Sequence, residues 1–323
     1  MRRLRWILML AGLALVLAPG VVLGPYTLRV RHFAADPAAG YHADFYLYVS
    51  PTAKRAARAG HEVTLLVQPN NSGITSDDTD VHRKDAWWTG FGRHRLANDL
   101  GVVLLVPAFP RPANDWQVYT HALDRDALTT ARPDLARLDL QLLAMVDRAR
   151  TTLAAEGLPT DEKFMLQGFS ASGMFANRFT VLHPDRVKAV AAGSPGGWPI
   201  APLSSWKGEQ LPYPAGVADL EALTGKPFDA VAYATVPQVI VMGSLDDNDS
   251  VDFRDGWDEA AAAQVDRLFG SDPQARWEAA QQVYLLAGAE VRFERVGGVG
   301  HDRRKLQVNS THFLADILSR EAP

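Results

Sequence analysis

The chain has 323 residues, a formal net charge of −4 and no cysteine. The absence of thiols excludes cysteine catalysis, thiolate metal sites and disulfide bonds. No cluster of basic residues provides the positive face that nucleic-acid binding requires. We expect one large catalytic domain, because α/β enzymes often exceed about 250 residues as a single unit.

The first 24 residues have the pattern of a leader segment. Arg2, Arg3 and Arg5 precede an apolar run from Trp6 to Gly24, as in a secretory signal. The run is also nearly long enough to span a bilayer, which takes about 20 residues, so an uncleaved signal-anchor is the alternative. We expect an exported protein, periplasmic or secreted, in which residues 25–323 form a single domain. Membrane contact is expected only through an uncleaved anchor.

Apolar strand patterns alternate with helical patterns along most of the chain. Strands are expected at Asp44–Val49, Val63–Gln68, Val102–Val106, Lys163–Phe169, Val187–Ala192, Val239–Met242 and Val291–Val296. Helices are expected at Leu135–Ala155, Ser172–Leu182, Glu259–Phe269, Arg276–Ala287 and Arg304–Leu318. Uninterrupted apolar runs suit parallel strands buried on both faces. The alternation therefore predicts an α/β protein with a mostly parallel central sheet flanked by helices.

One segment departs from this alternation. Residues 195–236 lie between two apolar strands and are rich in proline, glycine and aromatic residues, including Trp198 and Trp206. Because long loops inside a compact domain often serve as lids or binding loops, we expect this insertion to form a lid or a substrate wall. The alternative is a surface excursion whose aromatic side chains only pack it down.

The sequence Gly168–Gly173 places Ser170 between an expected strand and an expected helix. A nucleophile elbow requires this strand–turn–helix context. Small residues two positions before and after the serine, Gly168 and Ser172, let the strand and the helix approach closely. A serine stands where the second glycine of the motif is usual. In the alternative interpretation, Ser170 or Ser172 only caps the helix.

A serine nucleophile needs a neighbouring base, and the base needs an orienting carboxylate. When the serine lies on such an elbow, the chain order is Ser, then Asp or Glu, then His. We expect His301 as the base, because it lies in a glycine-rich loop after the last strand; His312 lies in a helical pattern, and His121 lies in a polar loop. We expect Asp246 as the acid, three residues after the glycine that follows a strand, with Asp249 as its rival.

Acyl transfer also requires backbone N–H donors directed at the developing oxyanion. The residue after the nucleophile, Ala171, is the first expected donor. The second is expected from the loop Pro69–Gly73, at Asn70, with Asn71 left open as the alternative. We expect no metal and no cofactor to take part in this chemistry.

From Val63 onward the chain resembles the exported bacterial esterases and polyester-depolymerase-like serine hydrolases of the α/β-hydrolase superfamily. The matching pieces are Pro69–Gly73, the elbow Gly168–Gly173, the turn Gly243–Asp249 and Gly300-His301. The resemblance implies an α/β-hydrolase fold with a lid-like insertion. It also implies a carboxylic ester hydrolase that acts on a small or polymeric ester through a Ser-His-Asp triad. The alternatives are a peptidase or acyltransferase with the same triad, or a catalytically silent binding module.

Overall fold

The computed structural model describes residues 24, 26–71, 73–253 and 255–320. The expected leader, residues 1–24, therefore lies outside the described residues except for Gly24. Its cleavage and its role as an anchor stay predictions. In the described ranges, no helix is both long enough and apolar enough to cross a membrane.

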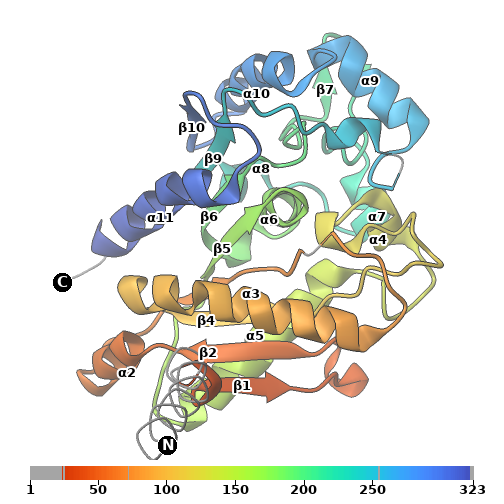
Figure 1. The fold of residues 1–323 in the computed structure, drawn as a ribbon. Coiled ribbons are helices and arrows are strands. Elements are labelled where there is room, and N and C mark those ends of the chain that lie inside the picture. Colours follow the sequence, from red (N-terminus) through yellow and green to blue (C-terminus); the bar gives the residue numbers. More distant parts are fainter. Residues whose placement is uncertain (1–23, 25, 72, 254, 321–323) are drawn as a thin grey trace, which may run out of the picture.

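An eight-stranded sheet forms the centre of the domain, in the order β1-β2-β4-β3-β5-β6-β9-β10 (Figure 1). Its strands are β1 (Val30–Phe33), β2 (Phe45–Val49), β3 (Leu65–Val67), β4 (Val103–Pro107), β5 (Phe164–Phe169), β6 (Val187–Gly193), β9 (Gln238–Gly243) and β10 (Val291–Val296). Strand β2 runs antiparallel to both of its neighbours, and the other pairs are parallel. The predicted mostly parallel sheet is confirmed.

Helices cover both faces of the sheet, as Figure 1 shows. They are α2 (Pro51–Arg58), α3 (Thr79–Leu100), α4 (Arg125–Thr129), α5 (Leu138–Ala155), α6 (Ala171–Leu182), α7 (Leu220–Thr224), α8 (Ala230–Ala234), α9 (Glu259–Phe269), α10 (Pro273–Leu286) and α11 (Arg303–Arg320). Alternate residues of β4 pack into different cores, with Val103 and Leu105 on one face and Leu104 and Val106 on the other. Helices α5, α6, α9 and α10 contribute to the first core, and α3 and α11 cover the second.

Helix α3 is the largest element that the sequence patterns did not predict. It has 22 residues and begins after Asp78, whose carboxylate accepts a hydrogen bond from the N–H of Asp80. It ends at Gly101, which has a φ of 71° and closes the helix in the left-handed conformation. Two internal glycines, Gly90 and Gly92, are poor helix formers, and they obscured the pattern.

The insertion at residues 195–236 contains the short hairpin of β7 (Ser205–Trp206) and β8 (Glu209–Gln210) as well as helices α7 and α8. Its aromatic residues are anchored in the domain. Trp198 is 1% exposed and stacks on Phe269 of α9, with 3.9 Å between the ring centroids. Its indole N–H donates to the carbonyl oxygen of Ala215 at 3.0 Å. The segment is therefore packed into the same core as the helices around it.

We expect Trp198→Ala to lower the free energy of unfolding by about 3–5 kcal/mol, because it removes a stacked ring and leaves a cavity. Unfolding in urea, followed by circular dichroism, measures this change. Trp116→Ala is the matched control, since Trp116 is 45% exposed, and it should cost much less. Equal losses in the two variants would contradict the buried role of Trp198.

Candidate active site

Ser170 lies in a strained turn between β5 and α6. Its φ of 58° and ψ of −124° are unusual for a residue with a side chain, and a nucleophile elbow requires such a turn. The turn is possible because Gly168 and Gly173 have no side chains. A Cβ at Gly168 would lie 1.9 Å from the carbonyl oxygen of Ser172, and one at Gly173 would lie 2.6 Å from that of Gly193.

Ser172 holds the elbow together from inside. Its Oγ donates to the carbonyl oxygen of Phe169 and accepts from the N–H of the same residue, both at 3.0 Å. The residue is 2% exposed. The serine that replaces the usual glycine therefore adds hydrogen bonds to the turn.

His301 and Asp246 form a hydrogen-bonded pair in neighbouring loops. Nδ1 of His301 lies 3.0 Å from Oδ2 and 3.1 Å from Oδ1 of Asp246, which is almost completely buried. The N–H of Leu245 donates to the carbonyl oxygen of Val299 at 2.9 Å and joins the two loops. From α10, the side-chain amide of Gln274 donates to the carbonyl oxygen of Asp246 at 2.9 Å. The pair is thus supported on both sides.

The surroundings of Asp246 keep its carboxyl group ionised. Burial raises the pKa of Asp246, but the hydrogen bond from His301 and the other contacts of the carboxylate lower it by more, so the pKa lies below its ordinary value. An ionised carboxylate at Nδ1 orients the ring and leaves Nε2 as the nitrogen that can accept a proton.

Asp249, the rival acid, has a different partner. Both of its carboxylate oxygens accept from Nη1 of Arg276, at 2.6 and 2.7 Å, and this arginine is fully buried. Asp249 also caps a short helix through the N–H of Val251 at 3.0 Å. Of the two aspartates, Asp246 is therefore the one that contacts His301.

A cleft of about 620 Å³ contains both Ser170 and His301 in its lining. The imidazole of His301 also lies against the ring of Phe169, the residue before Ser170, with 4.6 Å between the ring centroids. Ser170 and His301 are thus brought to the same opening, and Asp246 lies behind His301.

One face of α3 forms a wall of this cleft. Asp85, Trp88, Thr89 and Arg93 all line it, and their spacing of three and four residues places them on one side of a helix. The ring of Trp88 is 56% exposed. Because α3 was not predicted from the sequence, this wall was not predicted either.

The loop Pro69–Gly73 reaches the cleft through Asn71. The expected donor, Asn70, does not line the cleft and is 0% exposed. Its side chain instead bridges to Phe109, donating to the carbonyl oxygen and accepting from the N–H, both at 3.0 Å. Asn71 lines the cleft, and its side-chain amide donates to the carbonyl oxygen of Phe169 at 3.2 Å. Of the two asparagines, Asn71 is therefore the one that reaches the cleft.

The other candidate histidines lie away from this opening. His121 is completely buried, and its Nε2 lies 2.8 Å from the carbonyl oxygen of Phe109. Burial lowers the pKa of His121 to about 3, so its ring is neutral. His312 is exposed on α11. In the part of the chain that the structure describes, no group of three or more His, Cys, Asp or Glu residues could hold a metal ion.

No protein-family model and no curated protein matches the sequence. Solved structures do match. Poly(aspartic acid) hydrolase-1 from Sphingomonas sp. KT-1 has a TM-score of 0.59 and 17% identity, over 88% of this chain and 98% of that chain. LpqC, a poly(3-hydroxybutyrate) depolymerase from Bordetella parapertussis, has a TM-score of 0.54 and 21% identity, over 91% and 94%. The chain has the α/β-hydrolase fold.

The α/β-hydrolase sheet explains how distant residues meet. Strands β5, β6, β9 and β10 are parallel neighbours, so the loops that follow them emerge at the same edge of the sheet. Ser170 follows β5, Asp246 follows β9 and His301 follows β10. Residues more than 130 positions apart in the chain therefore come together.

The expected lid contributes little to the cleft. Within residues 195–236, Gly196 is the one residue in its lining. Trp198 and Trp206 pack near Phe269 instead. This arrangement fits the alternative interpretation, a packed excursion, better than a substrate wall.

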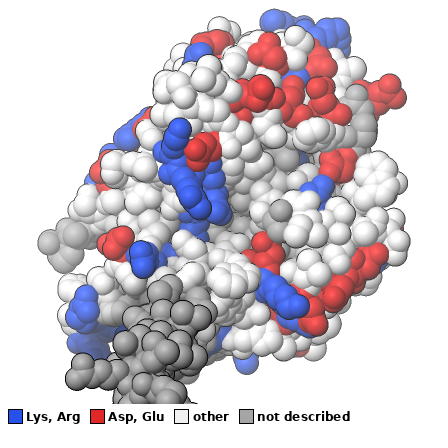
Figure 2. Space-filling model, viewed as in Figure 1, with Lys and Arg blue, Asp and Glu red and all other residues white. Residues whose placement is uncertain are grey.

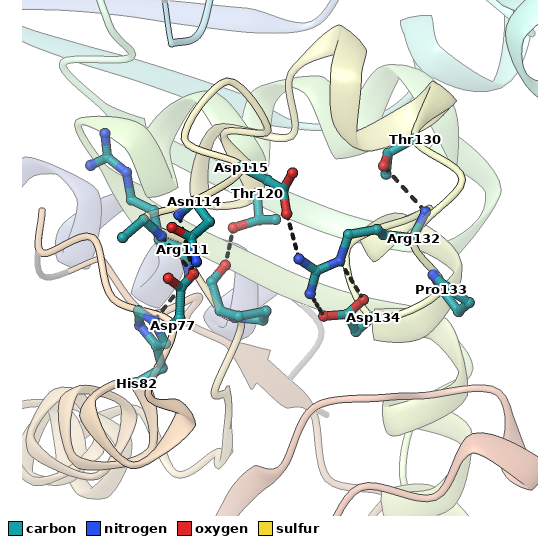
Figure 3. Close-up of polar contacts among 12 residues, drawn as sticks. Asp77, His82, Arg111, Asn114, Asp115, Thr120, Thr130, Arg132, Pro133 and Asp134 are labelled. Carbon is teal, nitrogen blue, oxygen red and sulfur yellow. Dashed lines mark hydrogen bonds and ion pairs between the residues drawn. The ribbon is translucent and has the colours of Figure 1, made fainter.

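The loop that contains Tyr119 forms another part of the cleft lining. Figure 3 shows the hydrogen bonds that brace this loop. Arg132 binds Asp115 and Asp134, and the N–H of Asn114 donates to Asp77 at 3.2 Å. The guanidinium of Arg111 lies over the ring of Tyr119, 3.8 Å from the centroid. This wall is therefore fixed by contacts on both sides of Tyr119.

We expect Gly168→Ala to lower the free energy of unfolding by about 1–3 kcal/mol or more, because the new methyl group overlaps the backbone of α6. Gly92→Ala is the matched control. Gly92 is exposed within α3, and a Cβ there would meet nothing within 4 Å, so the variant should gain about 0.5–1 kcal/mol. Urea unfolding of both variants measures the difference. A Gly168→Ala protein as stable as the wild type would rule out the close approach.

The lowered pKa of Asp246 predicts a pH-dependent contribution to stability. Its ionised form stabilises the fold at pH values above the pKa of the unfolded chain, about 3.9. This contribution disappears as the pH falls through the lower pKa of the folded protein. The destabilisation caused by Asp246→Asn should therefore be largest near neutral pH and shrink below about pH 4. Urea unfolding of the wild type and the variant, from neutral pH to below about pH 4, measures this destabilisation. The exposed Asp247→Asn is the control. A constant difference at every pH would contradict the prediction.

Proposed function

We propose that the protein is a serine hydrolase that cleaves carboxylic esters through an acyl-enzyme. The observation that carries the proposal is the pairing of His301 with a buried, ionised Asp246 beside the cleft that holds Ser170. This combination provides a nucleophile on an elbow, a base that lines the same cleft and a carboxylate that orients the base.

In the first half of the reaction, Oγ of Ser170 attacks the ester carbonyl carbon while Nε2 of His301 takes the hydroxyl proton. Asp246 accepts the Nδ1–H hydrogen bond and stabilises the imidazolium that forms. The same proton then passes from His301 to the leaving alcohol as its C–O bond breaks. The acyl group remains on Ser170 as an ester.

In the second half, a water molecule gives a proton to His301 and attacks the acyl carbon. His301 then returns this proton to Oγ of Ser170 as the acyl C–O bond breaks, which releases the carboxylic acid and restores Ser170. Both tetrahedral intermediates carry a negatively charged oxygen. We assign its two backbone donors to the N–H groups of Ala171 and Asn71, because both residues line the cleft. Such donors commonly contribute about 10²–10³ in rate.

The substrate class is supported by the cleft and by the two similar structures. The volume of the cleft lies within the range of about 300–1,000 Å³ that is usual for small-molecule sites. Exposed rings of Trp88 and Phe253 line it and offer apolar contact to an acyl chain. One of the similar structures is named as a poly(3-hydroxybutyrate) depolymerase and the other as a poly(aspartic acid) hydrolase. Both support hydrolysis of an acyl bond, with an ester or an oligomeric ester as our choice.

A peptidase and an acyltransferase could use the same residues, and a silent binding module could keep the fold without the reaction. A fluorophosphonate probe distinguishes a silent binding module from an enzyme, because the probe labels only an activated serine. We expect labelling of the wild type at Ser170. An unlabelled but folded wild type would overturn the enzymatic proposal.

Four variants test the assigned roles. Ser170→Ala should abolish turnover of 4-nitrophenyl esters, by about 10⁶ in kcat. Asp246→Asn should lose about 10⁴, because the imidazole takes the wrong tautomer. Asp249→Asn should keep most activity but lose stability, since buried Arg276 loses its bidentate partner. Ser172→Ala should also keep most activity.

Circular dichroism first verifies that each variant is folded, so that a loss of activity reports on the reaction. An inactive Asp249→Asn beside an active Asp246→Asn would reverse the assignment of the acid. An inactive Ser172→Ala beside an active Ser170→Ala would move the nucleophile. Normal activity in all four variants would exclude the mechanism.

A further inference from the structure

Four arginines are buried among the described residues, and one of them has no partner. The three others bind carboxylates or a backbone carbonyl: Arg276 (Asp249 and Asp266), Arg111 (Asp255) and Arg178 (Ala122). Arg93 is 5% exposed, and no hydrogen bond or ion pair joins its guanidinium to any described residue. Its Nε in particular is buried without an acceptor.

An unpaired guanidinium is costly to bury, because it loses water and gains no counter-charge. Burial and the nearby charge of Arg303 lower the pKa of Arg93 to about 10. The group therefore stays cationic near neutral pH. A bound anion would supply the missing partner and offset the cost of burial.

The position of Arg93 places this charge in the candidate active site. Arg93 and Arg303 line the same cleft as Ser170. Arg303 is the first residue of α11, two positions after His301, and Figure 2 shows basic side chains gathered at the start of this helix. The acid on the same face of α3, Asp85, precedes Arg93 by eight residues, about 12 Å along the helix.

We propose that Arg93 and Arg303 form a carboxylate-binding subsite, so that the preferred esters carry a carboxylate a few atoms from the scissile bond. This inference rests on the proposed hydrolase function and specifies its substrate class. A guanidinium presents paired N–H donors that match the two oxygens of a carboxylate. The contact is stronger in a cleft than in open water, because the surroundings screen charge less.

Two pairs of matched esters test the subsite. The first compares 4-nitrophenyl hemiadipate with 4-nitrophenyl hexanoate, whose six-carbon acyl chains differ in a terminal carboxylate. The second compares 3-carboxyphenyl hexanoate with phenyl hexanoate and places the carboxylate on the alcohol side. For at least one pair, the ratio of kcat/KM values, anionic over neutral, should fall about tenfold or more in Arg93→Met. It should fall about two- to fivefold in Arg303→Gln, because Arg303 is exposed.

The matched control is Arg304→Gln. Arg304 is exposed on the same turn of α11 and does not line the cleft, so both ratios should equal those of the wild type. Arg93→Met should not lower Tm, because it removes an unpaired buried charge. A marked fall in its Tm would overturn the premise that Arg93 lacks a partner.

A second measurement needs no turnover. Adipate at millimolar concentration should raise the Tm of the wild type and of Ser170→Ala, but not that of Arg93→Met. The subsite is refuted if Arg93→Met changes neither the ratios nor this shift. If the wild type hydrolyses no ester and the adipate shift still depends on Arg93, the proposed function fails and the subsite stands.

Discussion

At Gly168, strand β5 and helix α6 approach so closely that no side chain fits between them. This contact fixes the backbone of Ser170 in its unusual conformation and holds its side chain at the carboxyl edge of the sheet. Ser172 adds two hydrogen bonds to the same turn. The rest of the site is arranged around this fixed point, because the loops after β9 and β10 must reach it from neighbouring strands.

Two buried aspartates of this protein differ in their surroundings. Asp139 is fully buried but is surrounded by Arg137 and His183, which together hold its pKa below the ordinary value against the effect of burial. Such a group rigidifies the domain because each polar atom has a partner. Asp246 combines burial with a contact to a ring that remains partly exposed, at 23%. A carboxylate placed in this way can stabilise a positive charge on His301 while it stays buried.

Elements that short, local sequence patterns specify could be predicted from the sequence. Helix α9 and strand β10 begin and end at the predicted residues, because their patterns are uninterrupted and end at glycine or charged turns. The elbow around Ser170 was recognisable because six consecutive residues specify it. The parallel sheet was predictable because strands alternated with helices.

Features that depend on contacts between distant segments were not predictable. Helix α3 was missed because two of its residues depend on contacts outside the helix. Trp88 is exposed to the cleft, and Gly90 leaves room for the side chain of Tyr26. The choice between Asn70 and Asn71 depends on Phe109, 39 residues away. The aromatics of residues 195–236 suggested a lid, because a sequence does not reveal that Trp198 faces Phe269.

The environment of Tyr26 determines how the domain can begin. Its side chain is fully buried among Tyr48, Trp87 and Phe91, and its hydroxyl lies 2.1 Å from the position that a Cβ of Gly90 would take. We propose that, where the predicted leader is removed, the cut comes before Tyr26, since a later cut would take this buried side chain from beneath α3, the helix that forms a wall of the cleft. An uncleaved anchor would join the domain with almost no spacer and restrict how far the domain could turn from the bilayer.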